Sequence, residues 1–194
     1  MPTTREYRMV RRGAAVAATR ERILAATIEL GYEELDLDPT LERIAARAGV
    51  SVQTVLRRFG SRGALLDEAL ASAQVAVAGE RVRAGGEQDP LVPLLAHYRL
   101  HGLFSLRMLA REDTDGRAAR ITSGGKQLHR DWVGTAFADR LSRSDAAHVE
   151  ALTDLLVVAT DVYAWKLLAL DRRLADAVVL ERMHTLVDAI LAPH

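Results

Sequence analysis

The spacing of apolar residues is the feature that most constrains the fold of this chain. Ile23, Ala26, Thr27 and Leu30 recur three and four residues apart, which is typical of a helix that buries one face. The same spacing continues along nearly the whole chain of 194 residues, and no convincing stretch alternates as a half-buried strand does. The sequence therefore predicts an all-α fold of about nine helices.

Composition supports this prediction and excludes several classes of protein. Hydrophobic residues make up 49% of the chain but aromatic residues only 5%, so we expect a mostly aliphatic core. Cysteine is absent, which excludes disulfides and thiolate metal sites and fits a reducing compartment. The N-terminus lacks the apolar core of a signal peptide, and no run approaches the ~20 apolar residues of a membrane span. We therefore expect a soluble cytoplasmic protein that does not enter membranes.

The charges are unevenly distributed although the net charge is zero. Residues 1–20 contain five arginines and one glutamate, and residues 51–66 contain three arginines and no acidic residue. Cationic segments of this kind can bind phosphate even in a neutral chain. We assign residues 1–18 to a basic N-terminal arm, which either tracks DNA or is a solvated tail.

Two predicted helices of fewer than ten residues flank a tight turn at Ala48-Gly49-Val50. Thr40 can cap the first helix and Ser51 the second. The turn needs a positive φ, which costs glycine little. Helices this short are marginal alone, so they need a shared core. That core can be supplied by Ile44, Ala45, Val50, Val55 and Phe59.

The second short helix turns polar and basic groups outward when Val55 and Phe59 face inward. Its outer face offers an amide and a hydroxyl for base edges, followed by two guanidinium groups for phosphates. The next helix begins at Ser61-Arg62, and its positive end favours phosphate. This pattern predicts a recognition helix, whereas the alternative is a solvated face on a core helix. DNA contacts are predicted for Thr40, Ser51, Val52, Gln53, Thr54, Leu56, Arg57, Arg58, Ser61 and Arg62.

Three blocks of the chain resemble, in order and spacing, the TetR family of transcriptional regulators. The blocks are residues 22–26, 44–51 and 59–66. The resemblance implies an all-helical homodimer with a helix-turn-helix DNA-binding domain at residues 19–64. It also implies an effector-binding and dimerisation domain at residues 65–194, in which the last two long helices of each subunit pair.

The chain departs from the family pattern at four positions in and just after the recognition helix. Leu56 stands where the family usually has an aromatic residue, mostly tyrosine, and leucine cannot donate a hydrogen bond to phosphate. Arg58 stands where histidine is frequent and can compensate, and Arg62 keeps the charge of the family's lysine. Gly63 replaces the usual glutamate, so a capping box is missing.

The last two predicted helices fit a dimer independently of the resemblance. The helix at about 145–170 is apolar on more than one face, as expected of a helix between its own core and a partner. The last helix, at about 174–191, carries a second apolar stripe. Four such helices would form an isologous homodimer and imply a palindromic DNA operator. The alternative is that both helices are buried within a monomer.

Aromatic and polar residues gather in the predicted middle helices. An aliphatic pocket with a few polar groups would suit a moderately apolar small-molecule effector of unknown identity, whereas the alternative is that each aromatic residue belongs to the core. The leading candidates are Trp132 and Trp165. The full set is Tyr98, His101, Phe104, Met108, Trp132, Asp161 and Trp165.

Patterns of enzymes and metal sites are missing from the sequence. His97 and His101 are four residues apart, but a zinc site needs at least a third ligand. Gly124-Gly125-Lys126 lacks the spacing of a P-loop and is predicted to be a loop before a helix. We therefore predict no enzyme activity, no metal and no cofactor.

The sequence predicts a DNA-binding transcriptional regulator, with repression released by a small-molecule effector. The alternative is a small-molecule binding protein with a vestigial DNA-binding head. Leu56, which replaces the family's usual aromatic residue, is the only residue that supports this alternative.

Overall fold

The protein is described from a computed structural model that covers residues 4–35, 37–84 and 89–192. Within these ranges the regular elements are helices and no strand occurs, which confirms the predicted all-α fold. The chain divides into two compact units, Met1–Ala73 and Gln74–His194.

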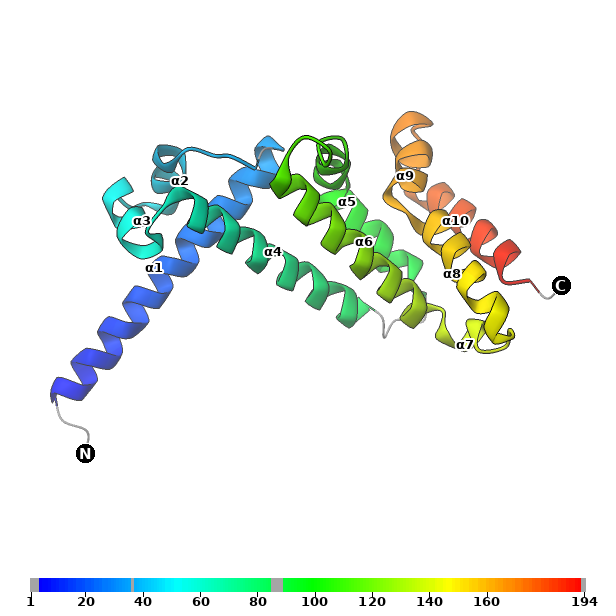
Figure 1. The fold of residues 1–194 in the computed structure, drawn as a ribbon, viewed down its shortest axis with the longest axis horizontal. Helices are drawn as coiled ribbons and strands as arrows, with labels where there is room; N and C mark the ends of the chain where they lie inside the picture. Colours follow the sequence, from blue (N-terminus) through cyan, green and yellow to red (C-terminus); the bar gives the residue numbers. More distant parts are fainter. Residues whose placement is uncertain (1–3, 36, 85–88, 193–194) are drawn as a thin grey trace. The chain divides into compact units, whose positions relative to one another are not determined.

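The first unit is built on three helices and the start of a fourth. They are α1 (Thr4–Glu34), α2 (Leu41–Ala48), α3 (Val52–Phe59) and α4 (Arg62–Ala84), of which α4 continues into the second unit. Helix α2 packs on both α1 and α3, as Figure 1 shows. The helices enclose one core of buried residues: Ile23, Ala26, Leu30, Ile44, Ala45, Ala48, Val55, Phe59, Leu65 and Leu66.

The ends of the two short helices are fixed by the residues that the sequence indicated. Thr40 Oγ1 accepts a hydrogen bond from the backbone N–H of Arg43 at 3.4 Å, and Ser51 Oγ accepts one from Thr54 at 3.2 Å. Gly49 ends α2 with φ of 65°, a conformation that glycine adopts at little cost. These contacts confirm the predicted caps and the predicted turn.

Helix α1 is longer at both ends than the sequence predicted. It begins at Thr4, so residues 4–18 of the predicted arm are helical backbone. It also continues beyond Leu30, the last residue of the apolar repeat, and ends at Glu34, where Leu35 takes φ of 51°. The added turn carries Glu33 and Glu34 to arginines of α2. We attribute the extension to these ion pairs.

The second unit contains the remaining helices and its own core. Helices α5, α6, α8 and α10 pack on one another (Figure 1) and α9 packs on α5. The elements are α5 (Leu91–Leu109), α6 (Gly116–Ala136), α7 (Ala138–Leu141), α8 (Ala146–Thr160), α9 (Val162–Trp165), a π-helix η1 (Lys166–Asp171) and α10 (Asp176–Ile190).

The prediction of a loop at Gly124-Gly125-Lys126 is wrong, because these residues lie inside α6. The helix starts earlier than expected, since the Asp115 carboxylate accepts hydrogen bonds from the N–H groups of Arg117 and Ala118. Lys126 Nζ also pairs with Glu112 at 2.8 Å. Two glycines cost a helix about 1 kcal/mol each, and the cap, the ion pair and the buried side chain of Ala118 offset that cost.

The prediction of one helix over about 145–170 is also wrong, because the chain turns at Asp161. Its backbone is extended, with ψ of 156°, and its carboxylate caps α9 by accepting from the N–H of Tyr163 at 2.8 Å. The carbonyl of Thr160 at the end of α8 accepts a hydrogen bond from Tyr98 Oη at 2.8 Å. Carbonyls at helix ends need such partners, so Asp161 and Tyr98 together stabilise the break. Figure 1 shows the break as the separation of α8 from α9.

A glycine on α5 makes room for the largest side chain at this break. Trp165 is 2% exposed, and a Cβ placed on Gly102 would lie 2.4 Å from its Cζ3 atom. A rigid, buried indole ring cannot yield to such a contact without moving its neighbours. Gly102 is therefore required for the packing of α9 against α5.

Substitution Gly102→Ala is expected to destabilise the protein by about 1–3 kcal/mol, the usual cost of overpacking a core. Equilibrium unfolding in urea would measure the loss. Gly134→Ala is the matched control, because Gly134 is also helical but has nothing within 4 Å of its Cβ position. The control should gain up to about 1 kcal/mol. Equal stability of Gly102→Ala and the unsubstituted chain would contradict the packing argument.

Candidate nucleic-acid interface

Helix α3 buries one face and exposes another, as the sequence predicted for a recognition helix. Val55 and Phe59 are buried, whereas Gln53, Leu56 and Arg57 are exposed. The Leu56 side chain is an unusual apolar group on this face and is 38% exposed. The exposed face therefore offers an amide, an apolar surface and a guanidinium group side by side along one helix.

Val52, Ser51 and Thr54 are less available than their place in the sequence indicated. Val52 is half-buried and packs against the core of the first unit. The hydroxyls of Ser51 and Thr54 are hydrogen-bonded to each other at 2.9 Å. Ser51 and Thr40 are the N-caps of α3 and α2. These polar groups hold the helix starts, where backbone N–H groups can face an anion.

The two arginines of α3 have different environments. Arg57 is exposed and Arg58 is half-buried. The Nε atom of Arg58 is buried and has no hydrogen-bond partner among the described residues. Leaving such a donor without a partner costs about 1–3 kcal/mol. Arg57 is the more accessible arginine of α3.

Arg62 and Ser61 make contacts within the first unit. The Arg62 Nε atom donates to the carbonyl of Pro39 at 3.0 Å, and its Nη2 atom pairs with Asp38 Oδ1 at 2.9 Å. Ser61 Oγ accepts from the N–H of Ala64 at 3.1 Å and caps α4. Arg62 therefore ties the connection before α2 to the start of α4, a role that sequence spacing did not indicate.

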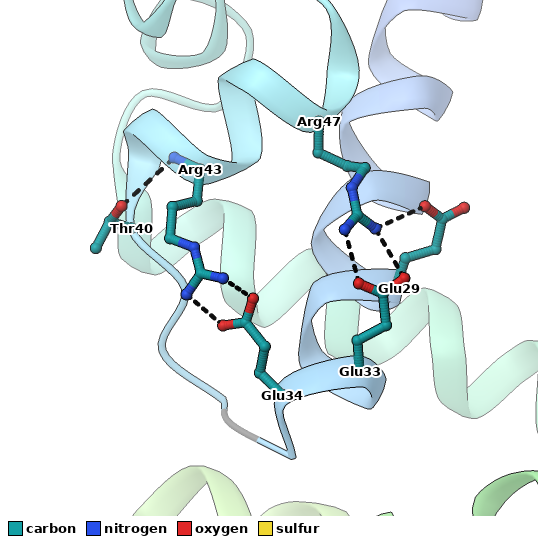
Figure 2. A network of polar contacts seen from close by, with 6 residues as sticks. All are labelled: Glu29, Glu33, Glu34, Thr40, Arg43 and Arg47. Atoms are coloured by element: carbon teal, nitrogen blue, oxygen red, sulfur yellow. Dashed lines mark hydrogen bonds and ion pairs between the residues drawn. The ribbon is translucent and has the colours of Figure 1, made fainter.

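A second set of ion pairs fixes α2 on α1, as Figure 2 shows. Arg43 pairs with Glu34, and Arg47 contacts Glu33 at 2.6 Å and Glu29 at 3.4 Å. The hydrogen bond from Arg47 lowers the pKa of Glu33 below its usual value, and the same bond raises the pKa of Arg47. Each exposed pair contributes little alone. Together they set the orientation of the helix that precedes the turn.

The structure brings only some of the predicted effector residues together. Tyr98, Trp132 and Trp165 share the core of the second unit, and the rings of Tyr98 and Trp165 are 5.7 Å apart. Asp161 lies four residues before Trp165, where it caps α9. Met108 is fully buried but lies outside that core cluster. The other two candidates, His101 and Phe104, are half-buried on α5.

Buried polar groups around these aromatic residues were not predicted from the sequence. Thr160 Oγ1 donates to the carbonyl of Leu156 at 2.7 Å and lies 3.1 Å from His129 Nε2. Because a hydroxyl has one proton, His129 Nε2 is the donor in the second contact. The Trp165 Nε1 atom is buried and has no hydrogen-bond partner among the described residues. No spacing rule identifies the contact between Thr160 and His129, since it joins α8 to α6 across 31 residues of sequence.

Metal and membrane sites were tested over the described part of the chain. The rings of His97 and His101 are 4.8 Å apart, but within the described ranges no three His, Cys, Asp or Glu side chains form a group that could hold a metal ion. Across those same residues, none of the helices combines the length and the apolar character needed to cross a bilayer.

Comparison with known families matches this geometry. Residues 23–69 match the family model described as bacterial regulatory proteins, tetR family. The matched segment runs from the buried part of α1 through α2 and α3 into α4, and it confirms the resemblance predicted from the sequence. No curated protein matches the chain.

Proposed function

We propose that the chain is a repressor that binds a palindromic operator, on the premise that residues 23–69 match the family model of bacterial regulatory proteins, tetR family. The observation that carries the proposal is the two-sided α3. Its inner face is buried by Val55 and Phe59, while Gln53 and Arg57 are exposed on the outer face. Such a helix can enter a major groove without exposing its core.

The exposed groups divide between base recognition and phosphate binding. The amide of Gln53 can pair with adenine, and the apolar side chain of Leu56 can contact a thymine methyl group. Arg57 and Arg58 can bind phosphates. In this reading Leu56 exchanges the backbone contact of the family's usual aromatic residue for an apolar contact.

Substitution of both Arg57 and Arg58 by Ala should weaken binding to a duplex that the unsubstituted chain selects from a random-sequence pool. The loss of two phosphate contacts should lower the slope of log K against log salt by about 1.8. Fluorescence anisotropy over a salt series would measure both changes. The matched control replaces the adjacent pair Arg172 and Arg173 of the second unit by Ala, and its slope should stay unchanged.

The same experiment tests the alternative that the helix-turn-helix domain no longer binds DNA. The apolar Leu56 is the residue that favours this alternative. If the unsubstituted chain enriches no duplex, or if the double arginine substitution leaves the affinity and the salt slope unchanged, α3 does not bind DNA. The chain would then be a small-molecule binding protein that kept the helix-turn-helix fold alone.

A homodimer formed by the last helices completes the proposed mechanism. Large apolar side chains are exposed on α8, α9, η1 and α10, and contiguous exposed apolar surface marks an interaction site. A second copy would cover them and, by two-fold symmetry, present two recognition helices to successive major grooves. The exposed residues are Leu155, Val158, Tyr163, Leu167 and Leu186.

Substitution Val158→Glu should convert the dimer to a monomer, because Val158 is 68% exposed and lies on α8. A charge there would be buried without a partner in the dimer. Sedimentation equilibrium should give two chains of 21.3 kDa for the unsubstituted protein and one for the variant. Val75→Glu is the control, since Val75 is 74% exposed on α4. A monomeric unsubstituted chain would contradict the proposed dimer.

The effector is proposed to bind beside Trp165. Its indole N–H is buried and has no acceptor in the described part of the chain, and a moderately apolar ligand with one acceptor atom could bind there. Asp161 and Tyr98 hold the break between α8 and α9 next to this ring. A ligand that binds one arrangement of this break more tightly than another would shift the dimer toward the first arrangement. The difference between the two ligand affinities would set how far the affinity for the operator changes.

Intrinsic fluorescence provides a direct test, because the chain contains two tryptophans and both lie in the core of the second unit. A compound library can be screened for a change in tryptophan emission, and a compound that binds should also release the selected duplex. Trp165→Phe should weaken that compound by about tenfold through loss of the N–H donor, whereas Trp132→Phe should bind nearly as well. Equal affinity for both variants would exclude Trp165 as the contact.

A further inference from the structure

We propose that Arg20 is a positioning residue for the recognition helix, which it holds by its C-terminal end instead of binding phosphate itself. The inference rests on the proposed DNA binding by α3. It concerns a residue that sequence analysis counted only among the cationic residues at the N-terminal end of the chain.

The guanidinium group of Arg20 contacts two other helices of the first unit. Its Nη1 atom donates to the carbonyl of Arg58 at 3.4 Å, and its Nη2 atom pairs with Glu68 of α4. Its Cζ atom lies 4.5 Å from the centre of the Phe59 ring, within the range of a cation–π interaction. One side chain of α1 thus joins the last two residues of α3 to the second turn of α4.

The end of α3 needs such a partner. The last carbonyls of a helix lack donors within the helix, and a cation near them is favourable because of the helix dipole. The following Gly60, with φ of 78°, ends the helix abruptly. With only eight residues in α3, a change at Phe59 is transmitted to Arg57 and Gln53 within two turns. Arg20 therefore controls the tilt and the rotation of the groups that face DNA.

The same contacts disfavour a direct role of Arg20 on phosphate. The Glu68 carboxylate already pairs with one edge of the Arg20 guanidinium group, and the ring of Phe59 lies against the face of the same group. Glu68 would also repel an approaching phosphate. The Arg20 side chain is 41% exposed, but these two contacts engage its guanidinium group, whereas Arg57 is exposed on the outer face of α3.

Positioning and phosphate binding predict different losses when Arg20 is replaced. Non-specific binding depends on the number of phosphates neutralised and sets the salt dependence. Base contacts depend on where the helix lies. Loss of a positioning residue therefore lowers the affinity for the selected duplex more than the affinity for random DNA.

The experiment compares Arg20→Gln, Glu68→Ala and the control Arg22→Gln, a substitution of an exposed arginine two residues further along α1. Each full-length variant is titrated with the selected duplex and with a random duplex over a salt series. For Arg20→Gln we expect the ratio of the two affinities to fall by about tenfold, the equivalent of one base contact, with an unchanged salt slope. Partial unfolding cannot imitate this result, because it weakens both duplexes by the same factor.

The direction in which Glu68→Ala changes the affinity for DNA distinguishes positioning from phosphate binding. Positioning requires this substitution to weaken the selected duplex, since Arg20 loses the partner that holds it. If Arg20 binds phosphate, removal of the competing carboxylate tightens both duplexes and steepens the salt slope. The latter result, or an Arg20→Gln ratio equal to that of Arg22→Gln, overturns the inference while leaving the proposed function intact. An unsubstituted chain that selects no duplex overturns both.

Discussion

The structure of the first unit depends on the burial of one face of α2 and one face of α3 in a core shared with α1. Helices of eight residues do not persist in water on their own, and here they share a core with Ile23 and Leu30 of α1. Because Val55 and Phe59 are buried, the outer face of α3 consists of Gln53 and Arg57 with the apolar Leu56 exposed beside them. The burial that makes the helices stable therefore also determines which residues form the proposed recognition surface.

Burial alone does not set the direction in which that surface points. Side chains of α1 and α4 do so: Arg47 and Glu33 join α2 to α1, while Arg62 joins α4 to the connection before α2. Each ion pair is exposed and individually weak. We infer that these pairs act mainly on geometry. Several pairs formed in one arrangement disfavour rotations of α2 and α4 that an aliphatic core alone would tolerate.

The sequence was sufficient for the local features and insufficient for the contacts between distant segments. Caps and the turn at Gly49 were predictable, because each depends on a few neighbouring residues. The break at Asp161 was missed because it lies within an apolar run. It is also stabilised by Tyr98, which lies 62 residues before its hydrogen-bond partner Thr160. Arg20 carried a weak signal: it lies three residues before Ile23 and so on the buried face of α1.

These contacts are compatible with the proposed binding of DNA by a chain whose net charge is zero. Arg20, Arg43, Arg47 and Arg62 pair with acidic residues of the head, so they add little to its long-range field. The exposed Arg57 then acts from a helix whose orientation those pairs fix. Affinity from charge number would give binding to any sequence, whereas a few well-placed groups give discrimination. Among the described arginine side chains of the first unit, Arg20, Arg43, Arg47 and Arg62 join helices or connections to one another, whereas Arg57 is exposed on α3.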